Sequence, residues 1–344
     1  MMNLPEKLKD FKPYPPMTET IPVRLDGNES CYPLPDKLMN EIAEVVRNTP
    51  LHRYPDPAAA EVCALAEAFW DAPEGSAVAG NGSDELISVA LSALLPRGGK
   101  LLVCDPDFSM YRFYAALYEI ECVGVPRTPG VPGAEELIQA GRGADAVILS
   151  NPCNPTGQVL PLPQVVQMVE TLTCPVLLDE AYMDFWEESS VLPYIERYNN
   201  LIVLKTCSKN LALAGIRLGF VFAGAELADI LRSVKSPYNV SSVTQAIGAA
   251  VLRHPELLLK NTNRIRAQKD KLYARLSEWA RFRDGVTVTD TAANFVLLDL
   301  PDAAGCHAAL RAKGIAVRLI NGGLRITAGT GNEITALMEA LQFV

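Results

Sequence analysis

The chain alternates short apolar runs with longer amphipathic stretches between about residues 60 and 230. The apolar runs have strand length and are rich in Val, Ile and Leu: KLLVCD (100–105), ADAVILSNP (144–152), CPVLLDEAY (174–182), NLIVLKTCS (200–208) and LGFVFAG (218–224). Segments of helical length, such as 83–95 and 162–172, lie between them. Continuous apolar strands that alternate with helices predict an α/β protein with a mostly parallel sheet between helices.

The pattern changes after about residue 240. A long region of helical character (241–280) precedes four short apolar runs and a final helical stretch (331–342); the runs are VTVTD, NFVLLDL, GIAVRLI and LRITAG. This order favours a smaller α+β domain. The first 35 residues contain seven prolines and read as an extended arm that packs on that domain. We therefore predict an arm at 1–35, a large domain at 36–240 and a small domain at 241–344.

Composition narrows the class of protein. The net charge of −9 argues against nucleic acid or an anionic membrane as the main partner. The chain has no apolar run of 18 residues and no secretory leader pattern at its start. Its eight cysteines are scattered and it has only three histidines, so no metal-ligand spacing appears. We expect a reduced, cytoplasmic protein that acts on small molecules without a metal.

Polar residues follow three of the predicted strands. Asn154 lies in the turn NPCNPTG (151–157), Asp179 and Tyr182 follow PVLL, and Ser208 and Lys209 follow IVLKT. Open α/β sheets bind ligands at the carboxyl ends of their strands. Each residue alone has an ordinary structural explanation, such as a turn, a cap or a surface charge. Their recurrence at strand ends favours a shared site.

A fourth polar cluster is the glycine turn GNGSDEL (80–86). Here Gly82 precedes Ser83 and Asp84, which begin a predicted helix. The unpaired backbone N–H groups of a helix N-terminus attract anions. The motif is not the dinucleotide fingerprint, because Glu85 stands where its third glycine would be. The chain also lacks a P-loop and a G-x-S-x-G serine-hydrolase elbow.

Pyridoxal 5'-phosphate suits these clusters together. Its phosphate would be bound by Ser83, Ser208 and Arg217 at the helix N-terminus. Its aldehyde requires a lysine, and Lys209 is the candidate. Arg217 follows an apolar run, so we expect it to be buried, with the phosphate as its counter-ion.

The cofactor ring requires three further kinds of group. Asp179 would keep the ring nitrogen protonated, so that the ring can accept electrons. Asn154 and Tyr182 would donate to the phenolic oxygen. Phe108, in CDPDFSMY, would lie on the ring face.

Several stretches, in this order, resemble one known family. They are GNGSDEL, PDFSMY, NPCNPTG, LLDEAYMDF, KTCSKNLALAGIRLGF and LRITAGT. The chain is similar to the class I/II aminotransferases of the fold-type I pyridoxal-phosphate superfamily, and within it most like the histidinol-phosphate aminotransferases. The similarity runs from KPYPP (12–16) to LRITAGT (324–330).

The resemblance implies roles for the cofactor region. Lys209 would bond the cofactor and act as general acid and base. Asp84 and Thr206 would lie near the phosphate. Tyr54 of RYPDP would reach the phosphate in the partner subunit, which implies a homodimer with shared active sites.

The resemblance also implies a substrate site. Arg325 would hold the substrate's α-substituent, and four further residues would surround the substrate: Tyr14, Asn28, Tyr238 and Arg318. The implied reaction transfers an amino group from histidinol phosphate or an amino acid to 2-oxoglutarate. Threonine-phosphate decarboxylation and aromatic amino-acid transamination are the alternatives within the family. A nicotinamide-binding protein and a non-catalytic binding module are alternatives of other classes.

Overall fold

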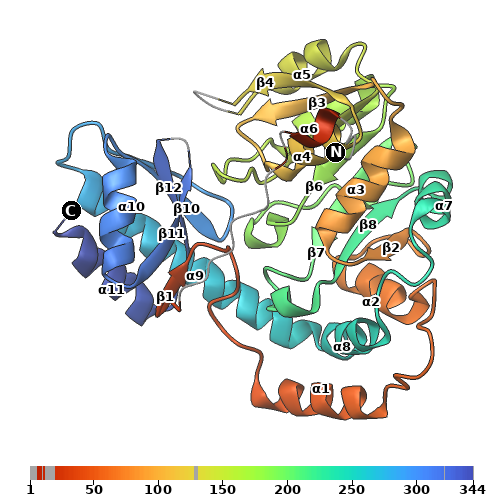
Figure 1. The fold of residues 1–344 in the computed structure, drawn as a ribbon, viewed down its shortest axis with the longest axis horizontal. Helices are drawn as coiled ribbons and strands as arrows, with labels where there is room; N and C mark the ends of the chain where they lie inside the picture. The colour runs from red at the N-terminus through yellow and green to blue at the C-terminus, as the bar shows by residue number, and fades with distance from the viewer. Residues whose placement is uncertain (1–5, 10, 12–19, 128–130, 321, 344) are drawn as a thin grey trace, which may run out of the picture.

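A computed structural model describes residues 6–9, 11, 20–127, 131–320 and 322–343 (Figure 1). Its larger sheet has seven strands, in the order β2 (Ala77–Gly80), β8 (Gly219–Ala223), β7 (Leu201–Thr206), β6 (Val176–Asp179), β5 (Ala146–Ser150), β3 (Lys100–Asp105) and β4 (Glu121–Pro126). All neighbouring strands are parallel except where β8 meets β2 and β7. The predicted α/β fold with a mixed, mostly parallel sheet is confirmed.

Helices cover both faces of this sheet (Figure 1). The core on one face includes α2 (Ala60–Trp70), α5 (Ala134–Gly141), α6 (Leu162–Thr171) and α8 (Ser242–Leu252), and α1 (Asp36–Asn48) packs on α8. The other face packs against α3 (Ser83–Leu94), α4 (Met110–Leu117) and α7 (Ala225–Val234). Successive strand residues alternate between the two cores: Val203 lies in the first, and Ile202 and Leu204 lie in the second. Burial on both faces explains the continuous apolar runs.

The smaller sheet has five strands, in the order β1 (Val23–Leu25), β11 (Ile315–Ile320), β12 (Gly323–Thr327), β10 (Phe295–Asp299) and β9 (Thr287–Thr289). Its core is completed by α9 (Pro255–Ala280), α10 (Ala303–Ala312) and α11 (Gly331–Leu341). The proline-rich N-terminal segment contributes β1, which pairs in parallel with β11. The boundaries of the predicted arm and two domains stay a prediction.

The helical region 241–280 forms two helices. It breaks between α8 and α9, where Pro255 takes a first-turn position of α9, as proline without an N–H commonly does. The long α9 joins the two cores, because Leu258 packs in the larger one and Leu272 in the smaller (Figure 1). One helix, α9, therefore contributes side chains to both cores and links the larger sheet to the smaller one.

Four short 3₁₀ helices complete the described elements: η1 (Glu6–Lys9), η2 (Met183–Phe185), η3 (Leu192–Tyr194) and η4 (Ala214–Ile216). No helix within the described residues is long and apolar enough to cross a membrane. The cytoplasmic location stays a prediction.

Candidate active site

A cavity of about 250 Å³ opens where β5, β6 and β7 end. Ten of the residues predicted from the sequence line it: Ser83, Asp84, Phe108, Asn154, Asp179, Tyr182, Thr206, Ser208, Lys209 and Arg217. They come from five separate stretches of chain. The fold therefore brings together the strand-end residues that the sequence pattern predicted to meet.

Lys209 follows β7 on the connection to β8. Its side chain is half-buried and its Nζ donates a hydrogen bond to the backbone oxygen of Gly27 at 3.0 Å. The Nζ also lies 5.8 Å from the centre of the Tyr182 ring. Lys209 thus lies inside the cavity that it shares with Asp179, as the proposed bond to a cofactor requires.

Asp179 ends β6 and its carboxyl group is buried. The Tyr111 hydroxyl donates to one oxygen at 2.7 Å, and the Ala181 N–H donates to the other at 3.0 Å. Burial raises the pKa of Asp179 to about 6 in spite of these two hydrogen bonds. A cation against this carboxyl group would offset the cost of ionising it, so the site suits a protonated ring nitrogen.

Tyr182 and Asn154 present hydrogen-bond donors to the cavity. The Tyr182 hydroxyl accepts from Asn28 Nδ2 at 2.9 Å, which leaves its own proton available to a ligand. Asn154 Oδ1 accepts from Arg325 Nη1 at 2.6 Å. Because a guanidinium can only donate, the Asn154 amide must turn its oxygen to Arg325, and its Nδ2 remains as a donor.

The N-terminus of α3 forms the anion end of the cavity. Gly82 precedes it with φ +83°, and none of the described side chains caps the helix. A Cβ at Gly82 would lie 2.7 Å from Arg217 Nη2, so the turn requires glycine for the arginine to approach. Gly219 has a related role on β8, because a Cβ there would lie 2.5 Å from the Ser83 nitrogen. These contacts place backbone N–H groups and a guanidinium beside one another.

The expectation that Arg217 is buried is wrong. Its side chain is 46% exposed and its Nη2 lies 3.1 Å from Asp84 Oδ2. Arg217 follows η4 with φ +53°, and this left-handed turn places it at the cavity rather than in the core. The buried cation of this stretch is Lys205, which pairs with Glu180 at 2.9 Å and Asp184 at 3.3 Å.

The predicted substrate residues differ in where the structure places them. Asn28 and Arg325 adjoin the cavity through Tyr182 and Asn154. Arg318 lies directly across from Arg325 in the β11–β12 pair, so their side chains leave the same face of the smaller sheet. Tyr14 lies outside the described residues.

Tyr54 and Tyr238 stand apart from the cavity lining. Their rings stack on each other with centres 4.6 Å apart, and Tyr54 is 81% exposed. Neither is among the described residues that line the cavity of this one chain. The roles of all these side chains stay predictions.

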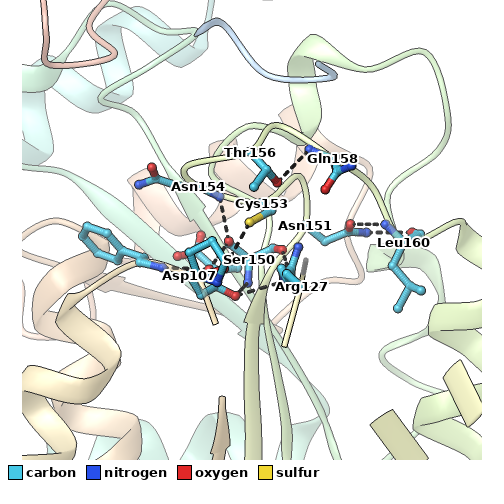
Figure 2. Close-up of polar contacts among 12 residues, drawn as sticks. Asp107, Arg127, Ser150, Asn151, Cys153, Asn154, Thr156, Gln158 and Leu160 are labelled. Carbon is cyan, nitrogen blue, oxygen red and sulfur yellow. Dashed lines mark hydrogen bonds and ion pairs between the residues drawn. The ribbon is translucent and has the colours of Figure 1, made fainter. Parts of the chain in front are cut away.

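Sequence reasoning missed several residues that shape the site. Gly27, Glu29, Ser150, Ala181 and Ala214 also line the cavity. Asp107 and Tyr111 support it from behind, although both lie in the quoted stretch PDFSMY. Figure 2 shows Asp107 beside Arg127 and Ser150, with Asn154 above them. The sequence feature that could have identified Asp107 is a charged residue next to Phe108, just after a predicted strand.

The residues at the cavity fit pyridoxal 5'-phosphate. An anion end, a buried carboxyl group, two neutral donors, an aromatic face and a lysine surround one space. Among the described residues no group of His, Cys, Asp or Glu could hold a metal ion. The donor set therefore suits an organic anion with a basic ring nitrogen.

Comparisons with known proteins agree with this assignment. The family profile "Aminotransferase class I and II" matches residues 20–341. The histidinol-phosphate aminotransferase of Clostridium kluyveri is 35% identical over 344 residues, covering 98% of this chain and 97% of the relative. That of Thermococcus gammatolerans is 35% identical over 343 residues, covering 98% and 96%. A crystal structure of histidinol-phosphate aminotransferase from Sinorhizobium meliloti with pyridoxal-5'-phosphate has the same fold, with a TM-score of 0.89 at 22% identity, covering 99% of this chain and 97% of that one. By the extent of the profile match and the identity to these relatives, the chain belongs to the class I and II aminotransferases.

Proposed function

We propose that this enzyme is a pyridoxal-phosphate-dependent aminotransferase whose amine donor is histidinol phosphate and whose acceptor is 2-oxoglutarate. The aminotransferase activity follows from the family and the cofactor is pyridoxal 5'-phosphate. The donor is proposed from the relatives that are named histidinol-phosphate aminotransferase. The observation that carries the proposal is the shared cavity of Lys209 and Asp179 at the ends of two neighbouring strands.

Each end of the cavity would hold one part of the cofactor. The N-terminus of α3 with Ser83, Ser208 and Arg217 would bind the phosphate. Tyr182 and Asn154 would donate to the phenolic oxygen. When bound, the cofactor supplies an aldehyde that bonds the substrate's nitrogen and a ring that accepts electrons from its Cα–H bond.

Lys209 and Asp179 would carry the proton chemistry. Lys209, once it no longer bonds the cofactor, would take the proton from the substrate's Cα and deliver it to the cofactor's C4′. Asp179 would keep the ring nitrogen protonated during that transfer. Water would supply the oxygen of the keto product while the cofactor retains the amino group, and 2-oxoglutarate would then receive that group and become glutamate, with Lys209 moving the proton in the opposite direction.

The two arginines of the β11–β12 hairpin suit both substrates. Histidinol phosphate carries a phosphate and 2-oxoglutarate carries carboxylates, and a guanidinium binds either group through paired hydrogen bonds. Arg325 is half-buried beside Asn154, with Arg318 across from it. The same two guanidinium groups can therefore bind first the phosphate of the amine donor and then a carboxylate of 2-oxoglutarate.

A panel of donors tests the proposed substrate. Histidinol phosphate, phenylalanine, tyrosine and threonine phosphate would each be supplied with 2-oxoglutarate, and glutamate and CO₂ would both be measured. The proposal expects glutamate formation with the largest kcat/KM for histidinol phosphate. CO₂ release from threonine phosphate, or a larger kcat/KM for an aromatic donor, would point to one of the alternatives, which the relatives do not favour.

Replacing Arg325 with glutamine is expected to weaken both half-reactions. The variant loses a charge-assisted hydrogen-bond pair, so kcat/KM for histidinol phosphate and for 2-oxoglutarate should each fall by about tenfold to a hundredfold. Single-turnover kinetics with each substrate measures the two effects separately. Arg311→Gln, on the exposed side of α10, is the control and should leave both values unchanged. An effect on only one substrate would contradict a shared anion site.

We also propose a homodimer with shared active sites. Tyr54 is exposed on this chain and stacks on Tyr238, away from the chain's own cavity. A second subunit could therefore receive Tyr54 at its phosphate end. Light scattering on the purified enzyme tests the dimer itself.

Subunit mixing is expected to restore activity if the sites are shared. Lys209→Ala and Tyr54→Phe subunits each impair a site, and phenylalanine preserves the ring stack with Tyr238. In a mixed dimer one site has both native residues, so unfolding and refolding an equal mixture should recover about a quarter of the wild-type rate at limiting cofactor. Unmixed samples refolded in parallel are the controls. If the refolded mixture had only the mean rate of the two variants refolded alone, the active sites would not be shared between subunits.

A further inference from the structure

A buried ion pair lies directly behind the cavity. Arg127, at the end of β4, and Asp107, after β3, have side chains that are 0% and 2% exposed, with 3.4 Å between Arg127 Nη2 and Asp107 Oδ2. Neither residue lines the cavity or takes part in the proposed chemistry. Apolar residues of similar size commonly give equal stability in place of a buried ion pair. The pair therefore calls for an explanation other than stability.

The hydrogen bonds of Asp107 connect two of the loops that form the cavity. Its Oδ1 accepts from the N–H of Phe108 at 2.8 Å and from the Ser150 hydroxyl. Its Oδ2 accepts from the Ser150 N–H at 3.2 Å, while Arg127 donates to the Ser150 backbone oxygen at 2.9 Å. The loop after β3, which carries Phe108, is thereby joined to the end of β5 (Figure 2).

Ser150 extends this connection to Asn154. Its hydroxyl has a single proton, which it gives to Asp107, and its oxygen then accepts from the Asn154 N–H at 3.0 Å. Asn154 in turn receives Arg325 at its side-chain oxygen. Figure 2 shows this order of contacts from Asp107 through Ser150 to Asn154. One carboxylate thus fixes the positions of an aromatic face and an amide donor on opposite loops.

We propose that Asp107, paired with Arg127, is a positioning residue that sets Phe108 directly and Asn154 through Ser150 against the cofactor. The inference rests on the proposed function. The positioning role also requires the negative charge of Asp107. An amide at position 107 cannot accept from the N–H groups of Phe108 and Ser150 and from the Ser150 hydroxyl together. An amide would also leave Arg127 without its counter-ion.

The test uses Asp107→Asn and measures more than activity. The affinity of the apo-protein for pyridoxal 5'-phosphate should fall by about tenfold to a hundredfold, the range for a lost hydrogen bond to a charged group. The pH midpoint of the bound cofactor's visible absorbance should move upward, because Asn154 no longer donates well to the phenolic oxygen and its ionised form is less favoured. Unchanged affinity and midpoint would overturn the proposal.

Two further variants separate positioning from folding. Asp107→Leu with Arg127→Met removes both charges and is expected to fold with near-native stability, yet to retain the raised midpoint. If this double variant restored the wild-type midpoint and affinity, the pair would be a packing element only. Ser150→Ala keeps the ion pair and should raise the midpoint by itself; a native midpoint in it would overturn the proposed route to Asn154.

The wild-type protein separates this inference from the proposed function. If wild-type protein failed to bind the cofactor, the proposed function would fail before Asp107 was tested. If it bound the cofactor and transferred amino groups while Asp107→Asn behaved identically, only the positioning role would fail.

Discussion

Replacing Lys209 with alanine is expected to abolish turnover. The variant loses both the amine that we propose bonds the cofactor and the base that we propose moves the Cα proton. General acid–base catalysis alone contributes about a hundredfold to ten-thousandfold, so kcat should fall by at least that much. The measurement is glutamate formation from histidinol phosphate and 2-oxoglutarate. A rate within tenfold of the wild-type would refute the assignment of Lys209.

Lys209→Arg is the matched variant for this experiment. Arginine keeps a positive charge at the position but is not deprotonated in proteins, so it cannot bond the aldehyde or act as base. If Lys209 only supplied charge, Lys209→Arg would retain activity; we expect it to be as inactive as Lys209→Ala. A cofactor that binds non-covalently to both variants would show that they fold.

The point of attachment can be mapped on the wild-type chain. Borohydride reduction should fix the cofactor on Lys209 and prevent tryptic cleavage there, which leaves the peptide 206–217 intact and heavier by the reduced cofactor. Lys205, in the strand that precedes Lys209, is the internal comparison because its amine is buried between Glu180 and Asp184. Modification at Lys205 in place of Lys209 would contradict the proposed site.

The sequence allowed the strand-end residues to be predicted because one physical pattern governs them. Parallel strands buried on both faces read as apolar runs, and a polar residue right after such a run must lie at one edge of the sheet. Asn154, Asp179 and Lys209 obey this pattern and line one cavity. The family resemblance added residues that the pattern alone does not find, such as Asn28 and Arg325.

The groups behind the site could not be found in this way. Tyr111 meets Asp179 across 68 residues of chain, and Arg127 meets Ser150 across 23, so no local spacing indicates either contact. Lys205 follows four consecutive apolar residues inside β7, so the sequence suggests only another position of a core strand. Its partners Glu180 and Asp184 follow a different strand. Such pairs form through tertiary packing, and one sequence without an alignment does not indicate which distant residues come into contact.

Arg217 shows a different limit. The apolar residues around it suggested burial, yet a left-handed residue after a 3₁₀ turn places it at the cavity. Backbone conformation at one position, and not the hydrophobicity of its neighbours, decided the outcome. Tyr54 shows another limit, because its ring is exposed on a single chain and only the proposed second subunit would give it a role at a cavity.

Replacing Asp179 with asparagine is expected to lower kcat by about a hundredfold to a thousandfold. The neutral amide no longer favours a proton on the ring nitrogen, so the ring accepts electrons less readily as the Cα–H bond breaks. The matched control is Asp105→Asn: Asp105 also ends a strand, β3, but it is exposed and pairs with Arg112 at the surface. Surface pairs contribute little, so this control should stay near the wild-type rate. Equal rates for Asp179→Asn and wild-type enzyme would exclude a role for Asp179 at the ring nitrogen.

The same substitution should change the pH dependence of stability in the cofactor-free protein. The folded-state pKa of Asp179 is about 6, raised by burial, whereas an unfolded chain has about 3.9. Between these values the folded state binds more protons, so the wild-type free energy of unfolding falls as pH rises from about 4 to 6, by a total of about 3 kcal/mol.

Asparagine cannot titrate, so Asp179→Asn should lack this decrease and gain stability relative to the wild-type between pH 4 and 8. Urea unfolding of both apo-proteins across that range measures the difference, and constant effects such as the altered Tyr111 hydrogen bond cancel within it. Parallel profiles would contradict the raised pKa.

With the cofactor bound, the protonated ring nitrogen would stabilise the Asp179 carboxylate, and the variant's advantage above pH 6 should disappear. The carboxyl group that the proposed chemistry requires is thus one whose ionised form the cofactor-free fold disfavours.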